Sequence, residues 1–130
     1  MSGPSQAGLF IYAKDIERVA KFYESVMGIS RLHATPEMVI LQLQNLQLLV
    51  HTIPEHIAST FEITTPPQRR EDTALKFFFT VDSIANARTM AATLGGEVFN
   101  EQWRGPGFTV CNGCDPEGNV FQVRENVSDK

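Results

Sequence analysis

Hydrophobic positions recur at helical spacing in two stretches of the chain, and polar positions fill the opposite faces. The first stripe lies in residues 16–27 and consists of Ile16, Val19, Ala20, Tyr23, Val26 and Met27. The second lies in residues 84–94 and consists of Ile84, Ala87, Met90, Ala91 and Leu94. Steps of three and four residues place each set on one side of a helix. The pattern therefore predicts two amphipathic helices, each with one buried face.

The two predicted helices sit in segments of similar layout, each running from an apolar strand through an aspartate and the helix to a glycine. Asp15 and Asp82 are 82 − 15 = 67 residues apart, and Gly28 and Gly95 are 95 − 28 = 67 apart. Aspartate favours the N-cap of a helix, where Ser83 is an alternative in the second unit, and glycine favours the residue after the last turn. A duplicated unit of strand and helix is the simplest explanation.

After each helix the period of the hydrophobic pattern shortens to two, which is typical of strands. Strands are predicted at 30–34, 37–44 and 46–52 in the first half, and at 97–102, 107–111 and 119–125 in the second. Each half thus has the order βαβββ, and we expect an α+β fold with mixed sheets. Residues 54–73 are rich in Pro, Thr and charge and are predicted to form a linker loop.

Composition restricts the class of protein. A chain of 130 residues with 42% hydrophobic residues fits one domain over residues 1–130, with modules at 8–53 and 74–126. The net charge is −4 and the eleven Lys and Arg are scattered, so we expect no nucleic-acid partner. No apolar run approaches the roughly 20 residues that span a bilayer, and no signal peptide is visible, so we expect a cytoplasmic protein without a membrane partner. Residues 1–7 and 127–130 are predicted to be flexible arms.

Cys111 and Cys114 raise the question of redox or metal chemistry. The segment that follows, DPEGN at 115–119, predicts a tight turn, because Pro116 fixes φ and Gly118 supplies a positive φ. The cysteines are therefore expected at a strand end and a hairpin entrance, whereas a reactive dithiol sits at a helix N-terminus that lowers its pKa. A zinc site also lacks ligands, because the chain has three histidines and no second CxxC. We expect two reduced, half-buried thiols.

Two stretches resemble the vicinal oxygen chelate superfamily, which includes glyoxalase I, the bleomycin-resistance proteins and the extradiol dioxygenases. AKDIERVAKFYESVMGI at 13–29 is similar to the family's strand, aspartate, helix with a Phe-Tyr pair, and terminal glycine. DPEGNVFQV at 115–123 is similar to its recurring D-P-D/E-G-N hairpin. The resemblance extends over residues 8–125 and implies that two βαβββ modules form a curled mixed sheet with a ligand cup. It also implies a homodimer.

Enzymes of this family hold a divalent metal in the cup through His, Glu or occasionally Gln. The resemblance places the ligand positions at Leu9 and Lys76, six residues before each aspartate, at Gln122, and at either Leu49 or Gln47. Leucine and an ammonium group do not bind a dication, and glutamines alone are a poor set. We therefore predict no metal and no other cofactor.

What remains is an apolar cup with a few polar donors, which is typical of a small-molecule pocket. Strand alternation predicts that Leu9, Ile11 and Ala13 face the cup with Lys76, Phe78 and Thr80. Gln47, Leu49 and His51 are expected to join them, with Gln122 and Arg124 opposite. Trp103 is predicted on a Gly/Pro loop, from which it closes over a ligand or stacks on an aromatic ring, and packing at a surface or interface is the alternative. The residues predicted to contact a ligand are Leu9, Ile11, Leu49, His51, Lys76, Phe78, Trp103, Gln122 and Arg124.

Three functions remain open. The leading one is a metal-independent binding protein of the glyoxalase/bleomycin-resistance type that holds an apolar or aromatic ligand. The second is a glyoxalase-like lyase or isomerase, with or without a divalent metal, in which Lys76, His51 or Arg124 polarises a carbonyl or acts as a base. For Lys76 the role of base requires burial that lowers its pKa. The third is a degenerate domain that acts by self-association.

Overall fold

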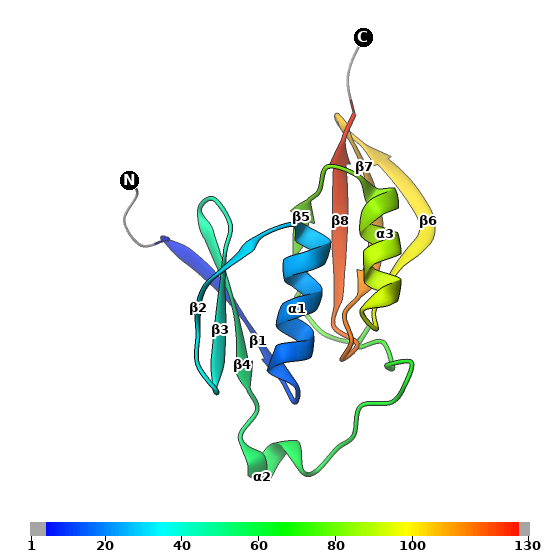
Figure 1. Cartoon of the computed structure of the whole chain (residues 1–130). Helices are drawn as coiled ribbons and strands as arrows, with labels where there is room; N and C mark the ends of the chain where they lie inside the picture. The colour runs from blue at the N-terminus through cyan, green and yellow to red at the C-terminus, as the bar shows by residue number, and fades with distance from the viewer. Residues whose placement is uncertain (1–4, 128–130) are drawn as a thin grey trace.

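The computed structural model describes residues 5–127, which form two βαβββ modules side by side (Figure 1). The first module contains β1 (Ala7–Ala13), α1 (Ile16–Met27), β2 (Ser30–Ala34), β3 (Met38–Gln42) and β4 (Leu46–Thr52). The second contains β5 (Phe78–Thr80), α3 (Ile84–Thr93), β6 (Glu97–Gly105), β7 (Phe108–Cys114) and β8 (Val120–Asn126). The predicted α+β class and element order are confirmed. The predicted terminal arms lie mostly outside the described residues, although β1 already begins at Ala7.

Each module has its own mixed four-stranded sheet, with the strand orders β1-β4-β3-β2 (sheet 1) and β5-β8-β7-β6 (sheet 2). The first strand of each module runs parallel to the last, and the remaining pairs are antiparallel. Figure 1 shows α1 and α3 next to each other, and the two helices are in contact. Each sheet therefore has one face covered by a helix and one open face. None of the helices within residues 5–127 is long and apolar enough to cross a bilayer.

The helix ends follow the sequence signals, and the structure selects one of the two caps predicted for the second helix. The Asp15 side chain accepts a hydrogen bond of 3.1 Å from the Arg18 amide, and Gly28 ends α1 with φ of 69°. In the second module Ser83, and not Asp82, is the cap, because its hydroxyl accepts from the Asn86 amide at 3.1 Å. Met90 was expected in the buried stripe of α3 but is 42% exposed.

The position of the helix cap shows which residues of the two modules correspond, and therefore which side of each strand faces the helix. The caps Asp15 and Ser83 are 83 − 15 = 68 residues apart, whereas the terminal glycines are 67 apart, because Gly28 follows its cap by 28 − 15 = 13 residues and Gly95 follows its cap by 95 − 83 = 12. Buried Ile11 therefore corresponds to buried Phe79, since 79 − 11 = 68. A one-residue shift in a strand exchanges its two faces.

The expectation that Leu9, Ile11 and Ala13 face the cup is consequently wrong. Ile11 and Ala13 are 7% and 0% exposed and belong to the core beneath α1, and Leu9 packs against the same core. On the open face of β1 lie Phe10 and Tyr12, which are 52% and 53% exposed and stack on each other. For β5 the expected face is correct, because Phe79 is buried and Phe78 is 50% exposed.

An aromatic cluster joins the modules. Phe22 and Tyr23 of α1 pack against Phe79 and Phe121 of sheet 2, with ring centroids 5.7 to 6.3 Å apart. All four side chains are at most 3% exposed. Burying this aromatic area in a single cluster explains why the two modules fold as one unit.

The turn before β8 adds a polar clamp between the modules. The buried Glu117 carboxylate accepts hydrogen bonds from the backbone amides of Lys14 and Asp15 at 2.9 and 2.8 Å. Burial raises the pKa of Tyr23 well above 10.0, and the neighbouring Asp115 carboxylate acts in the same direction. Burial also raises the pKa of Asp115, and hydrogen bonds to its carboxylate oppose that rise. Asp115 and Glu117 belong to the DPEGN segment that the sequence assigned to a turn.

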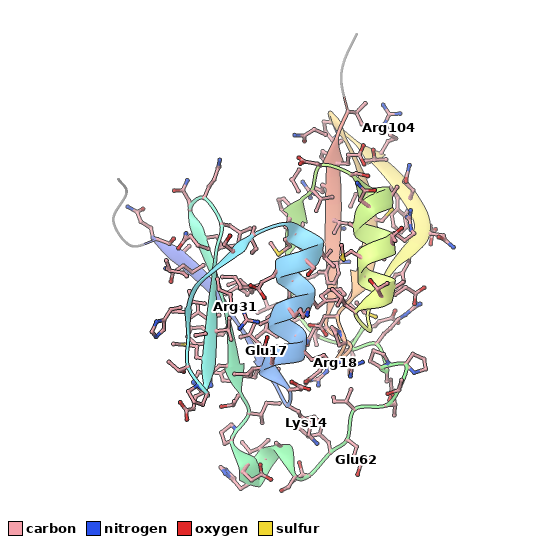
Figure 2. All side chains as sticks on the ribbon, in the orientation of Figure 1. Lys14, Glu17, Arg18, Arg31, Glu62 and Arg104 are labelled. Atoms are coloured by element: carbon pink, nitrogen blue, oxygen red, sulfur yellow. The ribbon has the colours of Figure 1, made fainter. Side chains whose placement is uncertain are left out.

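The linker predicted at 54–73 is irregular except for one short helix, α2 (Glu55–Ala58). It returns to the second module through Arg70, whose amide donates to the Gly118 carbonyl at 2.8 Å. The Lys14 ammonium lies 4.8 Å from the centroid of the Phe61 ring, and Figure 2 shows Lys14 above the linker that carries Glu62. The linker is therefore attached to both modules.

Candidate functional site

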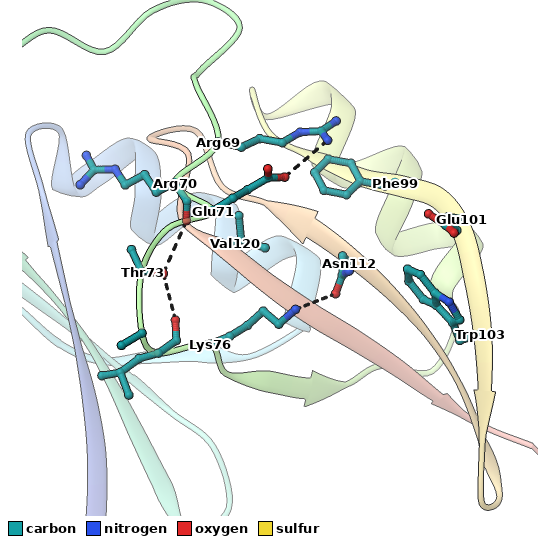
Figure 3. A pocket seen from close by; sticks show the side chains of 12 residues that line it. Arg69, Arg70, Glu71, Thr73, Lys76, Phe99, Glu101, Trp103, Asn112 and Val120 are labelled. Atoms are coloured by element: carbon teal, nitrogen blue, oxygen red, sulfur yellow. Dashed lines mark hydrogen bonds and ion pairs between the residues drawn. The ribbon is translucent and has the colours of Figure 1, made fainter.

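The open face of sheet 2 carries a row of polar side chains. Asn112 pairs with Gln122 across β7 and β8, and Gln122 pairs with Phe78 across β8 and β5. Two residues before Phe78, the Lys76 ammonium donates to the Asn112 side-chain oxygen at 3.3 Å (Figure 3). Sheet register therefore brings together a lysine and two amides that are far apart in the sequence.

A cavity of about 550 Å³ lies beside the Lys76–Asn112 pair. Its lining residues are Arg69, Arg70, Glu71, Thr73, Ala74, Leu75, Lys76, Phe99, Glu101, Trp103, Asn112 and Val120. Figure 3 shows Phe99, Glu101 and Trp103 along β6 on the side opposite Lys76. We call this space the sheet 2 cavity. It combines aromatic walls with a few charged and amide groups, as small-molecule sites commonly do.

The arginines of this cavity are engaged with the protein. The Arg69 guanidinium lies 3.7 Å from the centroid of the Phe99 ring and 3.9 Å from the Glu71 carboxylate. Arg70 points away from Asn112 in Figure 3, and its Nε donates to the Glu117 carbonyl at 3.1 Å. Lys76 is thus the cation that extends across the cavity toward sheet 2.

Trp103 lies on a strand and not on a loop. β6 continues to Gly105, Trp103 pairs with Val110 of β7, and the turn is formed by Pro106 and Gly107. Gly107 has φ of 78°, which suits the tight turn that shortens the predicted loop. Trp103 is 44% exposed and forms a fixed wall of the cavity. Because pairing with β7 holds this part of β6 in the sheet, the strand geometry does not favour the predicted closing of Trp103 over a ligand.

A second cavity of about 550 Å³, the β1 cavity, lies between the edge of β1 and residues 73–77. Leu9, Ile11 and Lys76 all line it, so these three predicted contacts meet there. Residues 73–76 and Val120 line both cavities. The chain that enters β5 therefore separates two spaces of similar size.

Leu49 and His51 lie elsewhere, on the open face of sheet 1. They pair with Phe10 and Tyr12 of β1, and the His51 and Tyr12 rings are 5.6 Å apart. His51 Nδ1 lies 2.9 Å from the Thr52 carbonyl oxygen. Neither Leu49 nor His51 lines either of the two cavities. The predicted contacts thus fall into separate groups on the two sheets.

Phe78, Gln122 and Arg124 share the open face of sheet 2 beside the cavity, as strand alternation predicted. The Arg124 guanidinium lies 3.6 Å from the centroid of the Phe78 ring. Sequence reasoning missed Asn112 and Phe99. Alternation from Gln122 across the hairpin would have identified Asn112, but no local signal marks Phe99, because a bulge between Val98 and Gln102 sets its position.

Lys76 is exposed, and its hydrogen bond to Asn112 is on the surface. The burial that its role as a base requires is therefore not found. An exposed ammonium on a flexible stem suits electrostatic attraction of a ligand better than proton abstraction.

The donor set does not fit the divalent metal that the resemblance implies for enzymes. Gln47 and Gln122 lie on different sheets, and the Gln47 amide donates to the Gln42 side-chain oxygen at 3.1 Å. Lys76 occupies the corresponding position at the start of β5. Within residues 5–127, no three His, Cys, Asp or Glu side chains are grouped so that they could hold a metal ion.

The cysteines lie within β7, which continues through Cys114 and corrects the predicted strand end at Cys111. The extension arises because Cys114 still pairs with Val120, so the hairpin begins later. Both thiols are free and at most 4% exposed, and they are more buried than expected. Burial raises the pKa of Cys114 to about 11, which disfavours the reactive thiolate.

Several proteins of known structure are similar to this chain in fold and in length. An enzyme of the glyoxalase/bleomycin resistance protein/dioxygenase family from Burkholderia phytofirmans PsJN is 17% identical, with a TM-score of 0.70 and coverage of 95% of this chain and 99% of that one. A lactoylglutathione lyase from Agrobacterium tumefaciens is 22% identical, with a TM-score of 0.60 and coverage of 95% of both chains.

The fosfomycin resistance protein FosX from Mesorhizobium loti is 12% identical, with a TM-score of 0.62 and coverage of 98% of this chain and 94% of that one. At these identities the likeness shows the fold alone. A search of curated protein sequences found no match. The family described as "Glyoxalase-like domain" matches residues 8–124. The chain therefore belongs to the glyoxalase-like domain family.

Proposed function

We propose that this protein binds a small organic ligand in the sheet 2 cavity and that binding does not require a metal. The observation that carries the proposal is the Lys76–Asn112 pair, 3.3 Å apart, at the side of a cavity of about 550 Å³ with Trp103 in its wall. This volume lies within the range of about 300–1,000 Å³ that drug-sized ligands occupy. The aromatic wall favours a ligand with a planar, apolar part.

The charge pattern supports binding over catalysis. Lys76 and Asn112 supply hydrogen-bond donors at one side, and Phe99 and Trp103 supply apolar area at the other. Binding needs these groups only to be fixed in place, whereas a base requires a group whose pKa is matched to the reaction. The exposure of Lys76 favours the first role.

Trp103 makes the proposal testable, because it is the only tryptophan of the chain. We expect planar aromatic fragments to change the intrinsic fluorescence of the protein in a saturable way, and Trp103→Phe to remove the signal. Lys76→Gln should weaken the binding of anionic or carbonyl-bearing fragments. Lys21→Gln, which removes a charge from an exposed site on α1, is the matched control. Absence of saturable binding across a fragment panel would refute the proposal.

The second part of the proposal, that binding does not require a metal, is tested separately. Fragment affinity should be the same after dialysis against EDTA and after addition of Ni²⁺, Zn²⁺ or Mn²⁺. Affinity that appears only with one of these ions would show that a metal is needed. Turnover of a 2-oxoaldehyde hemithioacetal, abolished in Lys76→Ala, would favour the lyase or isomerase function, which the lactoylglutathione lyase likeness keeps as the alternative.

We also propose that the open face of sheet 1 is covered by a second copy of the chain. Phe10 and Tyr12, which are about half exposed, form an apolar surface that water solvates poorly. Light scattering on the purified protein should then show a dimer. Disruption of that dimer by Tyr12→Glu, with the fold intact, would locate the contact.

A further inference from the structure

The Arg124 guanidinium packs against two aromatic rings. Its Cζ atom lies 3.6 Å from the centroid of the Phe78 ring and 4.3 Å from that of Phe108. Both distances fall within the range of cation–π contacts. The two rings hold the guanidinium in position.

No protein group in the described part of the chain fully satisfies the N–H groups of this guanidinium. Arg124 Nε is shielded from solvent and has no hydrogen-bond partner within residues 5–127, and no carboxylate in that range forms an ion pair with Arg124. Other arginines are paired: Arg31 contacts two glutamates, and Arg88 donates to two backbone carbonyls. Figure 2 shows the Arg31 and Glu17 side chains close together. Arg124 is thus fixed by packing but not by an ion pair.

Gly105 makes this arrangement possible. Gly105 and Phe108 face each other across the β6–β7 hairpin, and a Cβ atom on Gly105 would lie 2.2 Å from the Phe108 ring. The ring therefore rests across the glycine backbone on its way to Arg124. A larger residue at position 105 would displace the ring that packs against the guanidinium.

The row of residues through Arg124 continues toward the sheet 2 cavity. Trp103 pairs with Val110, and Val110 pairs with Arg124, so the three share one row of the open face. Neighbouring strands are about 4.8 Å apart, which separates the Trp103 and Arg124 backbones by about 10 Å. Val110, which is 8% exposed, lies between them. The row therefore has an indole at one side, an apolar floor, and a planar cation at the other.

We propose that Arg124 binds a carboxylate in the plane of its guanidinium, so that the ligand is a planar aromatic monocarboxylate with its ring directed toward Trp103. The inference rests on the proposed function and specifies its ligand class. The planar fork of N–H donors matches the two oxygens of a carboxylate. Glu71 and Glu101 line the adjoining cavity and would repel a second negative charge.

The test compares benzoate with benzamide, which has the same ring and nearly the same shape but no charge. Binding is followed by ¹⁵N–¹H NMR at the Trp103 indole and at the Arg124 Nε–H. We expect benzoate to shift both signals with one dissociation constant and benzamide to bind about tenfold or more weakly, because hydrogen bonds to charged groups are the stronger ones. Arg124→Gln should abolish this preference, and Arg124→Lys, which keeps the charge but not the fork, should remove most of it.

Arg104→Gln is the matched control, because it removes the same charge from an exposed position on β6 next to Trp103, on the opposite face of the strand. Figure 2 shows Arg104 at the far end of the second module. The Arg104→Gln variant should bind benzoate and benzamide with unchanged affinities. Equal binding of benzoate and benzamide, or a preference that survives Arg124→Gln, would overturn the inference while the fragment-binding function stands. Tighter binding of phenylphosphonate would assign the site to dianions and would also overturn it. If no fragment shifts the NMR signal of the Trp103 indole, the proposed function itself fails.

Discussion

Tyr23 donates a hydrogen bond of 2.8 Å to Asp115, and both side chains are fully buried. The bond joins α1 of the first module to the turn before β8 of the second. The same carboxylate accepts from the amides of Glu117 and Asn119 at 2.8 and 3.1 Å, and from the Asn119 side chain at 2.8 Å. The turn is thus built around one carboxylate that is anchored on the helix of the other module.

Tyr23→Phe removes this bond without opening a cavity. Asp115 keeps its other hydrogen bonds, so we expect the free energy of unfolding to fall by about 1–3 kcal/mol, the usual range for a bond to a charged group. Urea unfolding followed by circular dichroism measures the change. Tyr12→Phe is the matched control at an exposed tyrosine and should change stability by no more than about 0.5 kcal/mol. Equal effects of the two substitutions would show that the buried bond contributes nothing.

The cost of Tyr23→Phe should depend on pH. Burial raises the pKa of Asp115 above the ordinary 3.8, and the Tyr23 hydrogen bond opposes this rise by stabilising the ionised form. A carboxyl with a raised pKa binds more protons when folded, so its contribution to stability is complete below pH 3.8 and is lost as the pH rises through the folded pKa. Removing the tyrosine hydroxyl raises that pKa further. The difference in unfolding free energy between wild type and variant should therefore be smaller at pH 4 than at pH 7, and a difference that is independent of pH would contradict this account.

Glu117→Gln tests the clamp between the modules. An amide can accept from only one of the Lys14 and Asp15 amides and presents its own N–H₂ to the other, so we expect a loss of about 2–3 kcal/mol. Hydrogen exchange of the Lys14 and Asp15 amides should become faster. Glu125→Gln is the control within one module, because Glu125 accepts a single bond, from the Ile84 amide at 2.7 Å, which glutamine can keep. Unchanged exchange at residues 14 and 15 would refute the clamp.

Alanine substitutions at Gly118 and Gly107 distinguish the cost of backbone strain from the cost of steric overlap. Both have a positive φ, 89° and 78°, but a Cβ on Gly118 would lie 2.0 Å from the Gln68 carbonyl oxygen, whereas one on Gly107 has no neighbour within 4 Å. Gly107→Ala should cost about 1 kcal/mol through the strained φ alone. Gly118→Ala should cost clearly more and detach the linker at Gln68, which thermal unfolding and limited proteolysis can measure. A similar loss of stability in the two variants would show that the linker moves away from the added Cβ atom without further cost.

The two thiols should be inert in the folded protein. Cys111 and Cys114 are buried, and the raised pKa of Cys114 keeps it protonated at pH 8. With DTNB at this pH we expect no rapid reaction in buffer and two reactive thiols in urea. Rapid labelling of the native protein would show that β7 opens locally and would bring thiol chemistry back into consideration.

The sequence alone determined the elements of this protein, because the signals that specify them are local. Helical spacing, the cap at Asp15 and Gly28 placed α1, and alternation with the DPEGN turn placed the β7–β8 hairpin. The family resemblance rested on the same residues. The absence of metal ligands at Leu9 and Lys76 was also readable from the sequence, since it depends on residue type.

The tertiary structure decided which side chains meet. The cap Asp15 corresponds to Ser83 and not to Asp82, which shifts the correspondence between the modules by one residue, and Phe10 and Tyr12, not Leu9 and Ile11, lie on the open face of β1. The contacts of Lys76 with Asn112 and of Arg124 with Phe78 depend on the register of strands far apart in sequence. Local patterns fix the period of an element but not its absolute register, because register is set by pairing and packing with distant segments. The candidate site consists of such long-range contacts, and for that reason it became visible only in the folded chain.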